Sequence, residues 1–382
     1  MTRYTLKVRT QYQEINLMIN LIFFLPTFRY GGAGNSIFRL CKSLDKKKYI
    51  INIISIGKCD YKKEFNNFGV KVFELKTKKV SKSIFKLNSL VKKIISNKFS
   101  KNIFISGIHY ANVTSIISLR SIKNLKLIVV ERTDIQELKI HYNFVKFIKN
   151  TLIYVLLKIF YKKADLVITN SSKAKNDLQK ICNTKVIKIT PPSFSGYEKI
   201  KKNRRKSKSL QILTVGRLSW EKDIHTMIKA IGEIKEKKII LKILGDGKEK
   251  EKIKNLIKKY KLQKRIFVLG HKKKPKKYYL ESNLYINASH FEGFPNAIVE
   301  AINFNLPVIC SNCKGGSKEI ILNGRGGDLF DVGDYKILAK KIISFYQNPN
   351  KLKKKLKLSR ENIKKFSLEN NVRKYESIFR TV

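Results

Sequence analysis

The chain has 382 residues, 43% of them hydrophobic. This is too long for one ordinary core and apolar enough for two domains of about 150–200 residues, which excludes global disorder. The formal net charge is +54, from 82 Lys and Arg against 28 Asp and Glu. Such a field attracts anionic membranes and phosphorylated substrates, although compositional bias toward lysine is an equal alternative. A nucleic-acid partner is not expected, because the lysine runs lack interleaved aromatic residues and a reader motif.

The five cysteines are scattered and odd in number, which favours a reducing, cytoplasmic compartment. Cys310 and Cys313 form a lone C-x-x-C pair, and since zinc sites usually need a second pair, no metal is expected. The most apolar long segment, Phe144–Tyr161, is interrupted by three lysines, so no membrane-spanning helix is predicted. Basic residues before the apolar Leu17–Leu25 mimic a signal peptide, but no small-residue cleavage site follows. That stretch is instead expected to hold the first core strand, with Met18 as an alternative start.

The first half alternates short apolar runs with helical patterns, which predicts a parallel sheet covered on both faces. The expected strands are Asn20–Leu25, Ile50–Ile56, Ile103–Ser106, Leu127–Val130 and Leu166–Thr169. Helical segments between them include Asn35–Leu44 and Ile84–Ile95. Residues 1–195 are therefore predicted to form a Rossmann-like domain.

After Pro191 and Pro192 a basic run without acids, Lys199–Lys208, predicts a linker over residues 196–209. The second half then restarts the same alternation. Its expected strands are Gln211–Val215, Ile239–Leu244, Ile266–Leu269, Leu284–Asn287 and Val308–Cys310. Residues 210–366 would form a second doubly wound domain, and residues 367–382 a terminal helix that packs back on the first domain. Two such α/β domains would face a cleft, where the carboxyl ends of parallel strands bind ligands.

Two cations follow the first strand of the second domain. Gly216 ends that strand, and Arg217 and Lys222 occupy the loop before the next helix. Arg offers a planar fork of donors and Lys a point charge, so together they suit a diphosphate. In a chain so rich in lysine, two solvated loop cations are the competing interpretation.

Two acids lie eight residues apart in a segment that begins at Ala288. Pro295 is placed to be the first residue of a helix, so Glu292 would precede it and Glu300 would lie beyond its first turn. The amides near Asn296 and Ala297 would then face a ligand, where the helix dipole favours phosphate. Glu300 could accept hydrogen bonds from a ribose diol and Glu292 from sugar hydroxyls. Ordinary capping acids are the alternative.

The first domain offers weaker candidates at three strand ends. Tyr30–Gly34 is glycine-rich, which lets backbone approach a phosphate. His109 follows a strand, although a lone histidine is more often structural. Arg132 follows the next strand and could meet an anionic acceptor or the donor phosphate. Cys313–Glu319 contains another glycine pair, for which a plain turn is the alternative.

In this order the motifs resemble family 4 of the retaining glycosyltransferases, which have the GT-B architecture. The resemblance rests on several segments: Gly31-Gly32, Gly216-Arg217 through Lys222, Gly245-Asp246-Gly247, the Glu292/Glu300 pair, Gly315-Gly316 with Glu319, and Gly324, Gly327 and Gly333-Asp334. It covers the chain from about Asn20 and is strongest in the second half. The run Glu131–Asp134 is similar to members that make bacterial surface polysaccharides. The chain departs from the pattern at Gly34-Asn35, where many members have an acidic-basic pair.

The resemblance implies specific roles. Arg217 and Lys222 would hold the donor diphosphate, Glu300 the ribose and Glu292 the transferred sugar. Further donor-binding residues would be Gly32, Gly216, Gly270, His271, Phe294, Pro295, Asn296 and Ala297. His109 would touch donor sugar or acceptor. No cofactor or metal is implied, because two protein cations stabilise the leaving group.

The expected activity is transfer of a hexose or N-acetylhexosamine, with retention, from a nucleotide sugar. A UDP-sugar is the preferred donor, and a saccharide or lipid-linked saccharide of cell-surface polysaccharide synthesis is the expected acceptor. A GT-B sugar-nucleotide epimerase and a basic nucleic-acid-binding protein are the alternatives. The charge and the lipid-linked acceptor together predict a cytoplasmic protein attached peripherally to the anionic inner face of the membrane.

Overall fold

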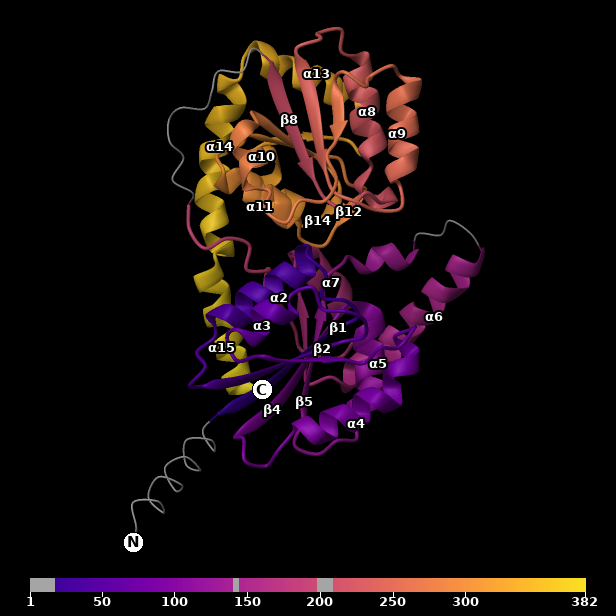
Figure 1. Cartoon of the computed structure of the whole chain (residues 1–382), viewed down its shortest axis with the longest axis vertical. Coiled ribbons are helices and arrows are strands. Elements are labelled where there is room, and N and C mark those ends of the chain that lie inside the picture. Colours follow the sequence, from indigo (N-terminus) through magenta and orange to yellow (C-terminus); the bar gives the residue numbers. More distant parts are fainter. Residues whose placement is uncertain (1–17, 140–143, 198–208) are drawn as a thin grey trace. The chain divides into compact units, whose positions relative to one another are not determined.

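The computed structural model describes residues 18–139, 144–197 and 209–382 (Figure 1). It divides into two compact units. Unit 1 comprises residues 1–192 and 368–382, and unit 2 comprises residues 193–367. The described part of each unit is built around one parallel sheet.

In the described part of unit 1 the sheet has seven strands in the order β3-β2-β1-β4-β5-β6-β7, all paired in parallel. The strands are β1 (Ile19–Leu25), β2 (Tyr49–Ser55), β3 (Lys71–Glu74), β4 (Lys101–Gly107), β5 (Lys126–Glu131), β6 (Leu166–Thr169) and β7 (Val186–Lys188). The helices are α2 (Gly32–Ser43), α3 (Lys62–Asn66), α4 (Ile84–Ile94), α5 (His109–Leu119), α6 (Phe144–Phe160), α7 (Ser172–Gln179) and α15 (Leu368–Thr381). Short 3-10 turns cover Ser81–Ser83, Ile135–Lys139 and Tyr161–Lys163.

Both faces of this sheet are buried, which is why its strands are continuous apolar runs. Along β1, Leu21 and Phe23 belong to one core and Ile22 and Phe24 to another on the opposite face. The alternation follows from the two-residue period of a strand. α15 supplies buried residues to the first of these cores, so the last helix of the chain is part of unit 1 and lies against α2 (Figure 1).

In unit 2 the described strands form a six-stranded sheet in the order β10-β9-β8-β11-β13-β15 and a two-stranded sheet of β12 and β14. The strands are β8 (Leu210–Val215), β9 (Ile239–Leu244), β10 (Ile266–Val268), β11 (Leu284–Asn287), β12 (Phe291–Glu292), β13 (Val308–Ser311), β14 (Lys314–Gly315) and β15 (Asp328–Phe330). The helices are α8 (Ile224–Glu233), α9 (Lys250–Lys259), α10 (Lys276–Glu281), α11 (Asn296–Asn303), α12 (Ser317–Ile320), α13 (Tyr335–Gln347) and α14 (Asn350–Ile363). Short 3-10 turns cover Trp220–Lys222, Leu322–Gly324 and Lys364–Phe366.

Each sheet has one point where the strand order reverses. In unit 1 the chain runs outward from β1 to β3 and then returns to place β4 on the other side of β1. In unit 2 the same reversal lies between β8 and β11. Ligands of open α/β sheets bind beyond the carboxyl ends of the strands at this switch point. The fold thus marks the loops after β1 and β4, and those after β8 and β11.

The prediction of two Rossmann-like parallel sheets is confirmed, and every strand expected from the sequence is present to within two residues at either end. The terminal helix expected over residues 367–382 is α15. Pro295, expected as the first helical residue, is instead the residue before α11, since its ψ of 89° is not helical. Most of the predicted linker, and all residues before Met18, lie outside the described residues.

Candidate functional site

The switch point of unit 2 brings together two residues that are 70 apart in sequence. Lys222 follows β8 and Glu292 follows β11, and Nζ of Lys222 donates to Oε1 of Glu292 at 2.6 Å. The same oxygen accepts hydrogen bonds from Ser289 Oγ at 2.7 Å and Asn287 Nδ2 at 3.2 Å. The carboxylate is therefore fixed by three donors on one oxygen, which leaves Oε2 outside these bonds.

Glu292 is almost completely buried, with 8% of its surface exposed. Burial alone would raise the pKa of its carboxyl, but the charge of Lys222 and the hydrogen bonds from Lys222, Ser289 and Asn287 outweigh it. The net result is a lowered pKa, so the carboxylate is ionised at neutral pH. Lys222 is consequently an ion-pair partner of a buried acid and not the solvated loop lysine that the sequence left as the alternative.

The loop that carries Glu292 is held by a close backbone approach. β12 and β14 pair so that Glu292 lies opposite Gly315, whose φ is +114°. A Cβ on Gly315 would lie 1.5 Å from the carbonyl oxygen of Glu292, so a larger residue cannot occupy this position without moving the loop. Gly316 N also donates to the carbonyl of Gly293 at 3.1 Å. The glycine pair that the sequence left as a possible plain turn thus positions the acid.

A second close approach holds the loop of the cations. Gly245 has φ +156°, and a Cβ there would meet the carbonyl oxygen of Gly216 at 1.8 Å. A Cβ on Gly247 would meet the carbonyl oxygen of Leu218 at 2.3 Å. Arg217 stands between these two clamped positions, is exposed, and forms no ion pair or side-chain hydrogen bond with the described residues. Its guanidinium is therefore available at the carboxyl end of β8.

The sequence did not identify an aromatic stack beside this pair. Trp220 precedes Lys222, and its ring stacks on His290 at 4.4 Å with an interplanar angle of 13°. His290 Nε2 lies 3.6 Å from Oδ2 of Asp223, which caps α8 from a left-handed backbone conformation. The stack joins the two loops at the switch point. Trp220 is the chain's single tryptophan, and this was the one feature of the sequence that could have drawn attention to the stack.

α11 supplies the second predicted acid. Glu300 lies in the second turn of this helix, and its Oε2 accepts a hydrogen bond at 3.1 Å from the buried Tyr279. At the start of the helix Asn296 accepts from Ser193 Oγ at 2.9 Å. The side chain of Phe294 packs in the core against Phe366, so only its backbone can reach a ligand.

The loop after β10 holds the remaining predicted donor residues of unit 2. Gly270 has φ +71° and accepts a hydrogen bond from Gly245 N at 3.0 Å. This bond ties the loop to the clamped turn beside Arg217. His271 is exposed. Both residues lie at the same edge of the sheet as Lys222, because they follow a parallel strand.

In unit 1 the glycine-rich loop follows β1. A Cβ on Gly34 would meet the carbonyl oxygen of Arg29 at 2.4 Å, so this glycine is required by the fold of its own loop. Gly31, with φ +149°, has open space where a Cβ would lie. Gly32 is the first residue of α2. The loop therefore presents backbone at the switch point of unit 1.

His109 and Arg132 follow the neighbouring strands β4 and β5. His109 is the first residue of α5 and is buried, with 3% of its surface exposed. Arg132 lies partly buried, and its Nε is buried without a hydrogen-bond partner among the described residues. Burial lowers the pKa of the Arg132 guanidinium. Both side chains are thus inside the edge of unit 1 and not on its open surface.

The described residues contain no cluster of three or more His, Cys, Asp and Glu side chains that could hold a metal ion. In the same part of the chain, no helix combines the length and apolar character needed to cross a bilayer. All five thiols are buried and unpaired. Burial raises the pKa of Cys310 and Cys313, so neither is a ready metal ligand.

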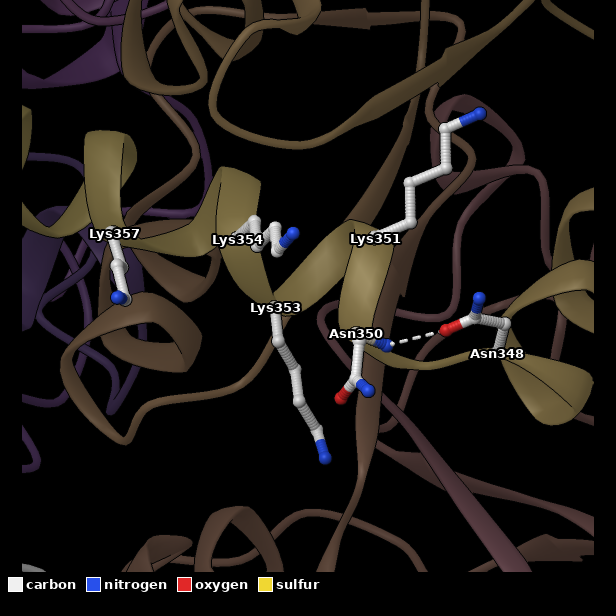
Figure 2. A pocket seen from close by; sticks show the side chains of 6 residues that line it. All are labelled: Asn348, Asn350, Lys351, Lys353, Lys354 and Lys357. Carbon is white, nitrogen blue, oxygen red and sulfur yellow. Dashed lines mark hydrogen bonds between the residues drawn. The ribbon is translucent and has the colours of Figure 1, made fainter.

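A basic hollow lies along α14 in unit 2 (Figure 2). It is lined by Asn348, Asn350, Lys351, Lys353, Lys354 and Lys357. Its lining has no aromatic side chain on which a base could stack and none of the predicted site residues. The hollow does not favour the nucleic-acid alternative.

The chain is similar in sequence and in fold to known glycosyltransferases. Residues 197–365 match the family model of glycosyl transferases group 1. An uncharacterized glycosyltransferase of Methanocaldococcus jannaschii is 30% identical over 186 residues, which are 44% of this chain and 45% of that protein. In Campylobacter jejuni, N-acetylgalactosamine-N,N'-diacetylbacillosaminyl-diphospho-undecaprenol 4-alpha-N-acetylgalactosaminyltransferase is 28% identical over 46% of this chain and 49% of its own. These matches span about half the length of either relative.

Among solved structures, HepE of Anabaena in complex with UDP-glucose is similar to the whole chain. The TM-score is 0.78 at 17% sequence identity, and the match covers 95% of this chain and 100% of that one. At this identity the likeness shows the shared fold alone.

Proposed function

We propose that this chain, a GT-B glycosyltransferase by its fold and by the family match of residues 197–365, transfers a hexose or N-acetylhexosamine from a nucleotide sugar with retention of configuration. The observation that carries the proposal is the Lys222–Glu292 pair, which holds a cation and a carboxylate side by side at the switch point of unit 2. Arg217 supplies a second, exposed cation after the same strand.

The proposed chemistry follows from charge. Breaking the bond between sugar and diphosphate builds negative charge on the leaving phosphate. Arg217, Lys222 and the first amides of α11, near Asn296, would stabilise that charge without reorganising. Glu292 would use Oε2 to accept a hydrogen bond from the transferred sugar, and Glu300 would bind the ribose. Retention follows from the resemblance to family 4, with front-face attack and the acceptor's proton passing to the leaving phosphate.

The proposed donor is a UDP-sugar and the proposed acceptor a saccharide or lipid-linked saccharide of surface-polysaccharide synthesis. HepE was solved with UDP-glucose, and the Campylobacter relative is named for an acceptor on diphospho-undecaprenol. A direct test titrates UDP-, GDP- and ADP-sugars while following the fluorescence of Trp220, which lies two residues before Lys222. Failure of all three to bind would refute the donor site.

Arg217→Ala is the sharper test of the cation's role, because Arg217 has no ion-pair partner among the described residues and its removal spares the fold. We expect the variant to lose donor affinity and turnover by about a hundredfold. Arg325→Ala is the matched control, an exposed arginine three residues before β15 and therefore at the opposite, amino-terminal edge of the same sheet. Equal transfer by both variants would remove Arg217 from the site.

We further propose that unit 1 binds an anionic membrane surface through α6. One side of this helix is exposed. Five of its exposed apolar residues form a stripe: Phe144 (72%), Ile148 (51%), Leu152 (56%), Val155 (44%) and Ile159 (44%), and Val145 (74%) and Phe147 (44%) are exposed beside it. Their spacing of three or four places these five residues on one face of α6, the helix labelled in Figure 1. The opposite side buries Ile153 and Leu157 in the core.

Lysines accompany this stripe, which is why an anionic lipid surface fits it better than a neutral partner. Lys149 and Lys158 lie on the helix, and Lys162 and Lys163 follow its end, all exposed. Each basic residue near an anionic surface contributes about 1 kcal/mol. Sedimentation with vesicles is the test: we expect binding to anionic vesicles, weak binding to neutral ones and release by high salt. Equal binding to both kinds, or to neither, would refute the surface while leaving the transferase proposal intact.

A further inference from the structure

Unit 1 contains a buried glutamate, Glu131, whose burial costs free energy of folding. Glu131 ends β5 and has none of its surface exposed. Among the described residues no lysine or arginine lies within ion-pair distance of Glu131. The basic side chain that lies within this distance is His109. A buried carboxylate without a cation is expensive, and an apolar residue would be more stable there.

A chain of hydrogen bonds fixes this carboxylate. Tyr161 donates its hydroxyl hydrogen to Oε2 of Glu131 at 2.7 Å. The oxygen of that hydroxyl accepts from Asn112 Nδ2 at 2.9 Å, and Asn112 in turn accepts from Ser106 Oγ at 2.7 Å. Burial, with the charge of Glu131, raises the pKa of Tyr161 far above its usual value, so the phenol keeps its proton and remains a donor. Oε2 is thus occupied, and Oε1, which also accepts a hydrogen bond from Thr133 Oγ1 at 3.4 Å, lies beside His109.

Oε1 of Glu131 lies 3.6 Å from Nδ1 of His109. Nδ1 is a buried atom without a hydrogen-bond partner, whereas Nε2 is not among such atoms. The residue before it, Ile108, has φ +78°. This conformation is a strained exception for a β-branched residue, and such strain concentrates at functional sites. The backbone is therefore bent to hold His109 beside Glu131.

We propose that Glu131 is a positioning residue that accepts a hydrogen bond from Nδ1–H of His109 and so fixes the ring in one tautomer. The lone pair of Nε2 is then turned to the carboxyl edge of the sheet as a hydrogen-bond acceptor. Closing the contact to an ordinary N–H···O distance needs roughly half an ångström, and such contacts often tighten only in the complex. An accepting Nε2 suits a hydroxyl group and does not suit a phosphate oxygen. The partner of His109 is accordingly a sugar hydroxyl, a step that rests on the proposed transferase function.

The tautomer can be measured without any transfer assay. Two-bond 1H–15N spectra of uniformly labelled protein separate protonated from unprotonated ring nitrogens, and His109→Gln identifies the His109 signals among the five histidines. We expect protonated Nδ1 and unprotonated Nε2. A wild-type ring protonated on Nε2 would overturn the proposal.

Glu131→Gln predicts a specific reversal. The hydroxyl of Tyr161 would donate its hydrogen bond to the amide oxygen of the new glutamine. The NH2 group of that glutamine would then face His109 and donate to Nδ1. The ring would then carry its hydrogen on Nε2, and kcat/KM would fall by about 10–100-fold, the usual size of a second-layer effect. Retention of the wild-type tautomer and of wild-type kcat/KM would refute the positioning role.

Tyr161→Phe is the matched control, because it removes a buried hydrogen bond and keeps the carboxylate. It should unfold at lower urea than wild type yet keep the Nδ1–H tautomer and kcat/KM within about threefold. If the network were merely structural, kcat/KM would instead fall in proportion to the loss of stability in both Glu131→Gln and Tyr161→Phe. If Glu131→Gln does not fold, the tautomer of the wild-type protein and the kcat/KM of Tyr161→Phe still test the positioning role. Absence of sugar transfer with the Nδ1–H tautomer present would overturn the proposed function and support the positioning of His109.

Discussion

Replacing Lys222 by alanine tests whether the cation of the site also stabilises unit 2. The change leaves Glu292, which is 8% exposed, with the hydrogen bonds of Ser289 and Asn287 alone. Breaking a fully buried ion pair costs about 3–5 kcal/mol, and breaking an exposed one at most about 1 kcal/mol. The side chain of Lys222 is 24% exposed, so we expect a loss of about 2 kcal/mol.

The measurement is urea unfolding at pH 7 followed by the fluorescence of Trp220, the single tryptophan, which reports unit 2. With a slope of about 2 kcal/mol per molar urea, the midpoint should fall by about 1 M. Lys254→Ala is the matched control, since its pair with Glu251 has the similar length of 2.9 Å but side chains that are 50% and 74% exposed. It should change the stability by less than about 0.5 kcal/mol.

The pH dependence gives an independent check on the same pair. In the wild type the pKa of Glu292 is lowered on folding, so the pair's contribution is present above the ordinary glutamate pKa and is lost as the pH falls through the lowered value. In Lys222→Ala burial dominates and raises that pKa, so the variant regains stability as its carboxyl takes up a proton. The gap between the two proteins should therefore narrow from pH 7 to pH 4. Equal midpoints for Lys222→Ala and Lys254→Ala at pH 7 would refute this reasoning.

Two further predictions follow from the same site. Gly315→Ala should lower the stability of unit 2 by about 3 kcal/mol or more, because its Cβ would overlap the carbonyl of Glu292, whereas Gly333→Ala, also at positive φ but facing open space, should cost about 1 kcal/mol in the same urea assay. Sugar transfer should survive excess chelator, since in the proposed mechanism Arg217 and Lys222 would supply the positive charge at the leaving group; activity that disappears in chelator and returns with manganese or magnesium would contradict this.

The strands were predictable because each is a short apolar run buried on both faces, and that pattern is local. The missed strands are short: β3 has four residues, β7 and β15 have three each, and β12 and β14 have two each. The four-residue strands β6 and β11 were predicted because they are buried throughout, whereas β3, β7 and β15 are partly exposed and so lack a continuous apolar run. The exposed side of α6 could not be predicted for another reason. Its sequence is apolar on most sides, and composition alone does not tell which side the rest of unit 1 covers.

The sequence named Lys222 and Glu292 separately but did not pair them, because a contact across 70 residues depends on the strand order. The same limit applies to the stack of Trp220 on His290 and to the contact of Glu131 with His109. In each case one partner follows a strand at a switch point and the other follows its neighbour in space. Strand order is a property of the whole sheet, and no local spacing encodes it.

The Lys222–Glu292 pair also explains how a cation can be held ready without being neutralised. Oε1 of Glu292 is shared by three donors, so its charge is divided among Lys222, Ser289 and Asn287. Lys222, Glu292 and Arg217 together carry a net positive charge, which can still attract a diphosphate. A carboxylate bound only to Lys222 would compete with the phosphate for the ammonium group. The two neutral donors weaken that competition while they keep the carboxylate ionised, so in the proposed site the same arrangement would leave Lys222 able to receive an anion.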